Sequence, residues 1–113
     1  MSPKLRVDAI EITDAEPAQS PGHCSAAVQV SLADGRQFSI LAATPSWFAE
    51  ALDKAGLEFY FGPLVLFVRS MDLGLVRRAV TDMVKDGDQW LCRYDTPRTT
   101  LGKVLAEFKA KHS

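Results

Sequence analysis

The stretch HCSAAVQVSLADGRQFSILAA, residues 23–43, decides the fold of this chain. Apolar and polar residues alternate on both sides of Asp34-Gly35, a dipeptide typical of tight turns between paired strands. Alternation with a period of two places one set of side chains on one face of a sheet. The stretch therefore predicts a β-hairpin with one buried face.

The register of this hairpin follows from the apolar pattern. A two-residue turn would set Leu32 opposite Gln37 and place polar residues against the apolar set. A three-residue loop, 33–35, with Gly35 in a left-handed conformation, aligns the two apolar sets instead. The apolar pairs predicted by this loop are Val30 with Phe38 and Val28 with Ile40.

Toward the N-terminus, residues 5–13 alternate in the same way and predict another strand. The alternation slips at Ala9-Ile10, so we expect a β-bulge there. Residues 14–22 contain Pro17, Pro21 and Gly22 among small or charged residues, and they predict a surface loop.

Toward the C-terminus, Thr44-Pro45 predicts the start of a helix that ends at Gly56. Residues 64–68 are five consecutive apolar residues, which is typical of a central strand covered on both faces. Either Ser70 or Asp72 can cap a second helix, running to about Asp86.

Residues 89–94 alternate and predict a short edge strand, and Thr96-Pro97 predicts the start of the last helix. The element order is β-β-β-α-β-α-β-α. It favours an α+β fold of two layers, with a mixed, mainly antiparallel sheet of about five strands and helices packed on one face.

The composition is that of an ordinary globular protein. The 113 residues carry a net charge of −1 and are 47% hydrophobic and 24% charged. This length predicts a single domain, residues 1–113. No apolar run is long enough for a membrane span, and no secretory signal is recognisable, so we expect a cytoplasmic protein without membrane contact.

The sequence contains no motif for a phosphate-binding loop, a zinc-dependent hydrolase or a nucleophilic serine. We therefore expect no cofactor, metal or catalytic residue. His23 and Cys24 are neighbours on a strand and point to opposite faces, so a cysteine-dependent enzyme would need His23 with Cys92. The spacing of Cys24 and Cys92 favours reduced thiols over a zinc site or a disulfide. Four acidic residues form a cluster near the N-terminus: Asp8, Glu11, Asp14 and Glu16. Their spacing does not match a calcium-binding loop.

Charge is unevenly distributed along the chain. Residues 1–60 contain four Lys or Arg against eight Asp or Glu, and residues 61–113 contain nine against six. On the second predicted helix, Arg77, Arg78 and Lys85 form a weak basic patch that could meet phosphates. The pI of about 6.1 and aromatic residues assigned to core faces argue against a nucleic-acid partner.

Aromatic residues supply the remaining candidates for binding. Trp47 and Tyr60 lie off the main core faces, and Phe61 and Pro63 belong to the segment that precedes the most apolar strand. Aromatic side chains commonly anchor interfaces. We therefore expect an interaction domain that forms a homodimer, through an open sheet face or an edge strand, or binds a protein partner. The alternative is a small-ligand pocket near Trp47 and residues 59–63.

Overall fold

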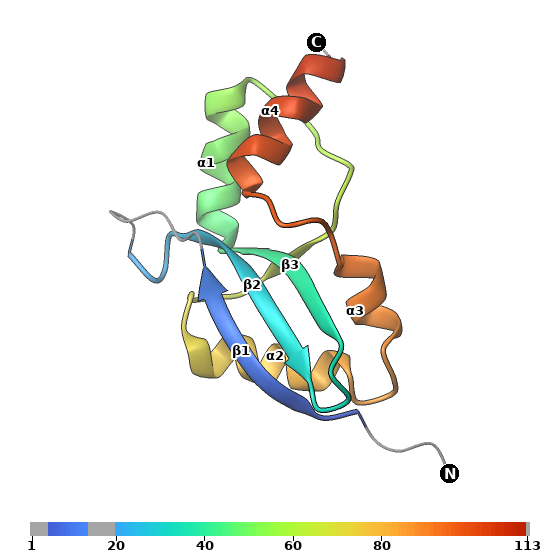
Figure 1. Cartoon of the computed structure of the whole chain (residues 1–113). Coiled ribbons are helices and arrows are strands. Elements are labelled where there is room, and N and C mark those ends of the chain that lie inside the picture. The colour runs from blue at the N-terminus through green and yellow to red at the C-terminus, as the bar shows by residue number, and fades with distance from the viewer. Residues whose placement is uncertain (1–4, 14–19, 113) are drawn as a thin grey trace.

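The computed structural model describes residues 5–13 and 20–112. In this part of the chain, four strands form one mixed sheet in the order β1-β2-β3-β4, accompanied by four helices (Figure 1). The elements are β1 (Val7–Thr13), β2 (Ser25–Leu32), β3 (Gln37–Ala43), α1 (Pro45–Ala55), β4 (Val65–Phe67), α2 (Leu73–Met83), α3 (Gln89–Tyr94) and α4 (Leu101–His112). Strands β1 to β3 are antiparallel, and β4 is parallel to β3. The predicted α+β class with a mixed sheet is confirmed, and the described residues form four strands where about five were predicted.

The hairpin of β2 and β3 has the predicted register. Val30 lies opposite Phe38 and Val28 opposite Ile40. The loop closes with Leu32 N–H donating to the carbonyl of Arg36 at 2.9 Å, and Gly35 has a φ of 93°. The bulge expected in the first strand is also present, but it lies between Val7 and Ala9, one residue earlier than the slip in the pattern.

Gly35→Val should lower the free energy of unfolding by about 1–3 kcal/mol, because a β-branched residue is strained at a positive φ. A Cβ at this position would meet no atom within 4 Å, so the expected loss comes from the backbone alone. Urea denaturation measures it. Gly22→Val is the matched control, since Gly22 has equally open surroundings and no left-handed φ. Equal losses in the two variants would contradict the assignment.

The ends of α1 and α2 follow the predicted signals with one difference. Asp72 caps α2 by accepting a hydrogen bond from the Leu75 N–H at 3.0 Å, and Gly56 ends α1 with a φ of 69°. The Thr44 hydroxyl does not cap α1. It accepts a hydrogen bond from the Cys24 N–H at 3.0 Å instead, which joins the beginning of α1 to the chain entering β2.

Residues 89–94 form the helix α3, so the predicted edge strand is wrong. Six residues are compatible with the period of 2 of a strand and with the period of 3.6 of a helix. In the helix, Leu91 is fully buried and Trp90 is half exposed. The polar groups of β3 that such a strand would have paired have other partners. The Ser39 N–H donates to the Asp95 carboxylate at 2.9 Å, and its carbonyl accepts from the Thr96 N–H at 2.8 Å.

The apolar run of residues 64–68 is not a central strand. It contains β4, which has three residues and lies at one edge of the described sheet. Leu64 and Phe67 are 43% and 50% exposed, whereas Val65 and Val68 are buried. The run is therefore divided between core and surface, and the expectation that residues 64–68 are covered on both faces is wrong.

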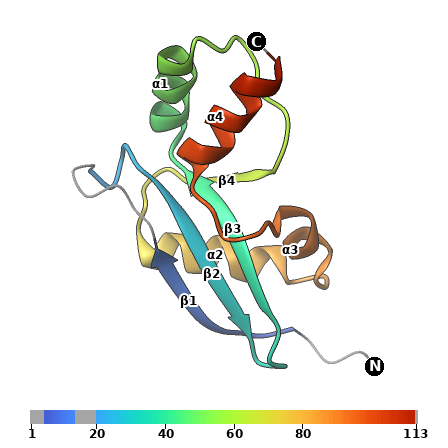
Figure 2. The same ribbon diagram turned by 45° about the horizontal axis from the view of Figure 1, so that its top comes forward.

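Helices cover both faces of the sheet, so the predicted packing on one face is also wrong. Ile40 and Ala42 face a first core cluster with α2 and α3, whereas Leu41 and Ala43 face a second cluster with α1 and α4. Successive residues of β3 point to opposite faces, so this one strand contributes to both clusters. Figures 1 and 2 show α1 and α4 together at one end of the sheet, and α2 crossing behind the strands.

Beyond α1 and α4, the second face of the sheet is polar. Gln29 donates to the Ser39 hydroxyl at 3.1 Å on this face, and Glu11, which pairs with Gln29, is exposed. This surface offers little apolar area to a partner. Separately, no helix in the described ranges is long and apolar enough to cross a membrane.

Candidate binding surface

The segment that joins α1 to β4 carries three consecutive aromatic residues. The rings of Phe59 and Phe61 are stacked, with centroids 6.3 Å apart, and these residues are 61% and 62% exposed. Tyr60 packs instead against Phe48 and Phe108, and its ring centroids lie 5.6 and 5.2 Å from theirs. The segment therefore holds one ring in the protein and presents two to solvent.

Two local contacts fix the conformation of this segment. The Tyr60 hydroxyl donates a hydrogen bond to the Pro63 carbonyl at 2.8 Å. A Cβ on Gly62 would lie 3.2 Å from that hydroxyl oxygen, so glycine allows the close approach of the ring. Partial burial of the Tyr60 phenol raises its pKa above the ordinary value, because desolvation disfavours the phenolate.

Two rings of helix α4, the buried Phe108 and the exposed His112, support the exposed ring of Phe61. Phe108 and His112 lie one turn apart and stack, with centroids 4.1 Å apart and an interplanar angle of 21°. Phe61 contacts both rings edge to face, at 5.1 Å in each case. We call the exposed Phe59, Phe61 and His112, together with the buried Phe108 ring beneath them, the aromatic surface.

A hollow of about 550 Å³ adjoins the aromatic surface, between α4 and the segments 60–63 and 96–99. This volume lies within the range of about 300–1,000 Å³ typical of small-molecule sites. Its ionisable lining residues are Tyr60, Arg98, Glu107, Lys111 and His112. The hollow thus combines aromatic walls with an excess of cationic side chains.

Three of the four aromatic and proline candidates from the sequence meet at this hollow. Tyr60, Phe61 and Pro63 line it, whereas Trp47 packs, partly buried, against the second core cluster and does not. The contribution of Phe108 and His112 was not predicted from the sequence. Their i,i+4 spacing on the last helix was a signal that they share a face, but not that this face meets residues 59–61.

The predicted basic residues also come together. Arg77, Arg78 and Lys85 line a second hollow, of about 590 Å³, along α2. Helix α2 lies at the far side of the molecule from α4 (Figure 1). The two candidate surfaces are therefore separate.

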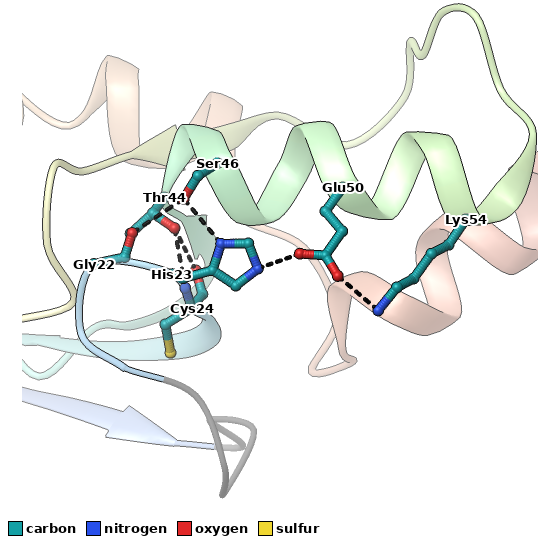
Figure 3. Close-up of polar contacts among 7 residues, drawn as sticks. All are labelled: Gly22, His23, Cys24, Thr44, Ser46, Glu50 and Lys54. Carbon is teal, nitrogen blue, oxygen red and sulfur yellow. Dashed lines mark hydrogen bonds and ion pairs between the residues drawn. The ribbon is translucent and has the colours of Figure 1, made fainter.

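A chain of polar side chains connects the residues before β2 to α1 (Figure 3). His23 Nε2 lies 2.6 Å from Glu50 Oε2, and Nδ1 lies 3.0 Å from the Ser46 hydroxyl. Lys54 Nζ lies 2.8 Å from the other oxygen of Glu50, and this hydrogen bond lowers the pKa of Glu50 below its ordinary value. This series of serine, histidine and carboxylate side chains was not predicted from the sequence, because Ser46 and Glu50 are distant in sequence from His23.

The Ser46 hydroxyl in this chain of contacts is engaged on both sides. It donates to the Gly22 carbonyl at 3.1 Å and lies 3.0 Å from His23 Nδ1. Both contacts connect the segment 22–23 to the first turn of α1. We therefore interpret these contacts as a tie between the segment 22–23 and α1.

The described contacts of His23 include no thiol, and Cys92 lies exposed on α3 while Cys24 is buried. Asp14 and Glu16 of the acidic cluster lie outside the described residues. Among the residues that the structure does describe, no three His, Cys, Asp or Glu side chains gather to hold a metal.

Comparison with models of protein families, with curated proteins and with solved structures finds no match to this chain, so its function has to be argued from its own residues.

Proposed function

We propose that this protein is an interaction domain that binds another polypeptide, in the simplest case a second copy of itself, through the aromatic surface. The observation that carries the proposal is the exposure of Phe59 and Phe61 beside a hollow. Exposed apolar patches next to concave surfaces are typical of interaction sites, and truncated aromatic anchors commonly weaken association by about 2 kcal/mol or more. A cytoplasmic location remains a prediction.

The side chains of the aromatic surface are held in place by contacts within the protein, and this favours a role in binding. Phe61 is held by Phe108 and His112, and the Tyr60 hydrogen bond holds the segment that carries it. Side chains that are already ordered lose less conformational entropy when a partner binds. The other surfaces first considered for a dimer are less suitable, because the open face of the sheet is polar and the outer strand β1 carries exposed Asp8 and Glu11.

Light scattering after size exclusion, over a range of concentrations, tests self-association. We expect the wild-type protein to dimerise and the double variant Phe59→Ala/Phe61→Ala to dissociate with a Kd at least tenfold higher, at a similar melting temperature. Trp90→Ala is the matched control, because Trp90 is half exposed but lies on α3. If all three proteins dimerise equally, the aromatic surface is not the interface. A wild-type protein that stays monomeric contradicts self-association.

Binding of a small ligand in the adjoining hollow is the second candidate function. Its aromatic walls and the cationic side chain of Lys111 suit a planar aromatic anion. Titration with naphthoate, followed by NMR, distinguishes the two functions. A monomeric protein whose residues 60–63 and 104–112 respond together to naphthoate supports the ligand site.

A further inference from the structure

We propose that the hollow along α2 is a docking site for a short acidic polypeptide segment. This inference does not depend on the aromatic surface, which lies on other elements. The hollow has a volume of about 590 Å³. Its lining residues are Leu5, Gly74, Arg77, Arg78, Thr81, Asp82 and Lys85. We call this hollow, lined by these residues, the α2 hollow.

The α2 hollow follows one face of the second helix. Its lining residues from Gly74 to Asp82 are spaced i, i+3, i+4, i+7 and i+8, which places them along one side of α2, and Lys85 lies just past the end of the helix. Val76 and Val80, on the opposite side, are fully buried in the first core cluster. Packing of those two valines therefore fixes the direction in which the cationic side faces. At about 1.5 Å per residue, the lined helical face from Gly74 to Asp82 is about 12 Å long.

The three cations of the α2 hollow have no partners in the described part of the chain. No hydrogen bond, ion pair or ring contact joins Arg77, Arg78 or Lys85 to another described residue, and Asp82 is the one carboxylate in the lining. By contrast, Arg36 and Lys54 are engaged by carboxylates elsewhere. Arginine presents a planar set of donors that matches a carboxylate in two hydrogen bonds. The excess positive charge is therefore available to an acidic partner.

The lining favours a polypeptide over a nucleic acid. It contains no aromatic ring on which a base could stack, and Asp82 would repel a continuous chain of phosphates. The chain as a whole has a net charge of −1, so it does not attract polyanions generally. An extended segment of about four residues spans about 12 Å, and Leu5 offers it one apolar contact. The fitting partner is thus a segment with several acidic side chains and one apolar side chain.

Fluorescence anisotropy tests this proposal with a labelled glutamate-rich heptapeptide that carries one leucine. We expect the wild-type protein to bind it at low salt, with an affinity that falls as salt rises, because the contacts are ionic. The double variant Arg77→Gln/Arg78→Gln should bind at least tenfold more weakly. A peptide in which glutamine replaces every glutamate should not bind.

The control variant is Lys103→Gln/Lys109→Gln, which removes the same charge from exposed positions on α4. It should change the affinity for the peptide less than twofold, and melting curves should show that both variants remain folded. Equal weakening in the two double variants would show an effect of net charge and overturn the site. Absence of peptide binding at millimolar protein overturns the proposal, and so does tighter binding of a single-stranded oligonucleotide of equal charge.

Discussion

Leu91→Ala is expected to lower the free energy of unfolding by about 2–5 kcal/mol, a large part of the 5–15 kcal/mol typical of a small domain. Leu91 is fully buried in the first core cluster and is the one buried residue of α3, beside the partly buried Tyr94. Removing its side chain leaves a cavity between the helix and the sheet. Urea denaturation followed by circular dichroism measures the loss.

Trp90→Ala provides the control for this prediction. In a strand, Trp90, Cys92 and Tyr94 would share a face and Leu91 would point away from it, whereas in α3 Trp90 is half exposed. Its described ring contact is a cation–π interaction with Arg93 at 5.2 Å, of a kind worth about 0.5–1 kcal/mol at exposed sites. A loss as large in Trp90→Ala as in Leu91→Ala would argue for the strand.

Ile40→Ala is expected to cost a similar 2–5 kcal/mol, because Ile40 is fully buried at the centre of the sheet opposite Val28. Phe67→Ala is the informative comparison. Phenylalanine is the larger side chain, but Phe67 is half exposed and packs edge to face on Phe48 at 5.3 Å. We expect its loss to be less than half of that of Ile40→Ala in the same assay. A larger loss in Phe67→Ala than in Ile40→Ala would support the central strand that the sequence predicted.

The sequence predicted most accurately where local chemistry and packing agree. Asp34-Gly35 favours a hairpin, and aligning the apolar residues on one face leaves a single register, which the structure has. The ends of α1 at Pro45 and Gly56 were equally readable, because proline and glycine act through their own backbone preferences.

The wrong predictions concern segments whose secondary structure or burial is determined by tertiary contacts. Residues 89–94 are too few to distinguish a period of 2 from one of 3.6, and the groups of Ser39 that a strand would pair are bonded to Asp95 and Thr96 instead. The apolar run 64–68 does not reveal that Phe67 lies at an edge. Composition alone cannot show which apolar residues a small sheet leaves in solvent.

The candidate surface was predictable only in its contiguous part. Tyr60, Phe61 and Pro63 are close in sequence, so an unusual aromatic segment could be recognised. The partners from α4, Phe108 and His112, depend on how a helix distant in the chain docks against that segment. Sequence periodicity gives the face of a helix but not the element that it meets.

The alternation of β3 between the two core clusters has a consequence for how the molecule unfolds. Ile40 and Ala42 anchor one cluster and Leu41 and Ala43 the other, all within four consecutive residues. Neither cluster can lose its contacts with β3 without releasing backbone that the other requires, so damage on one side is transmitted to both. The chain should therefore melt as one cooperative unit, with β3 among the last segments to exchange its amide protons.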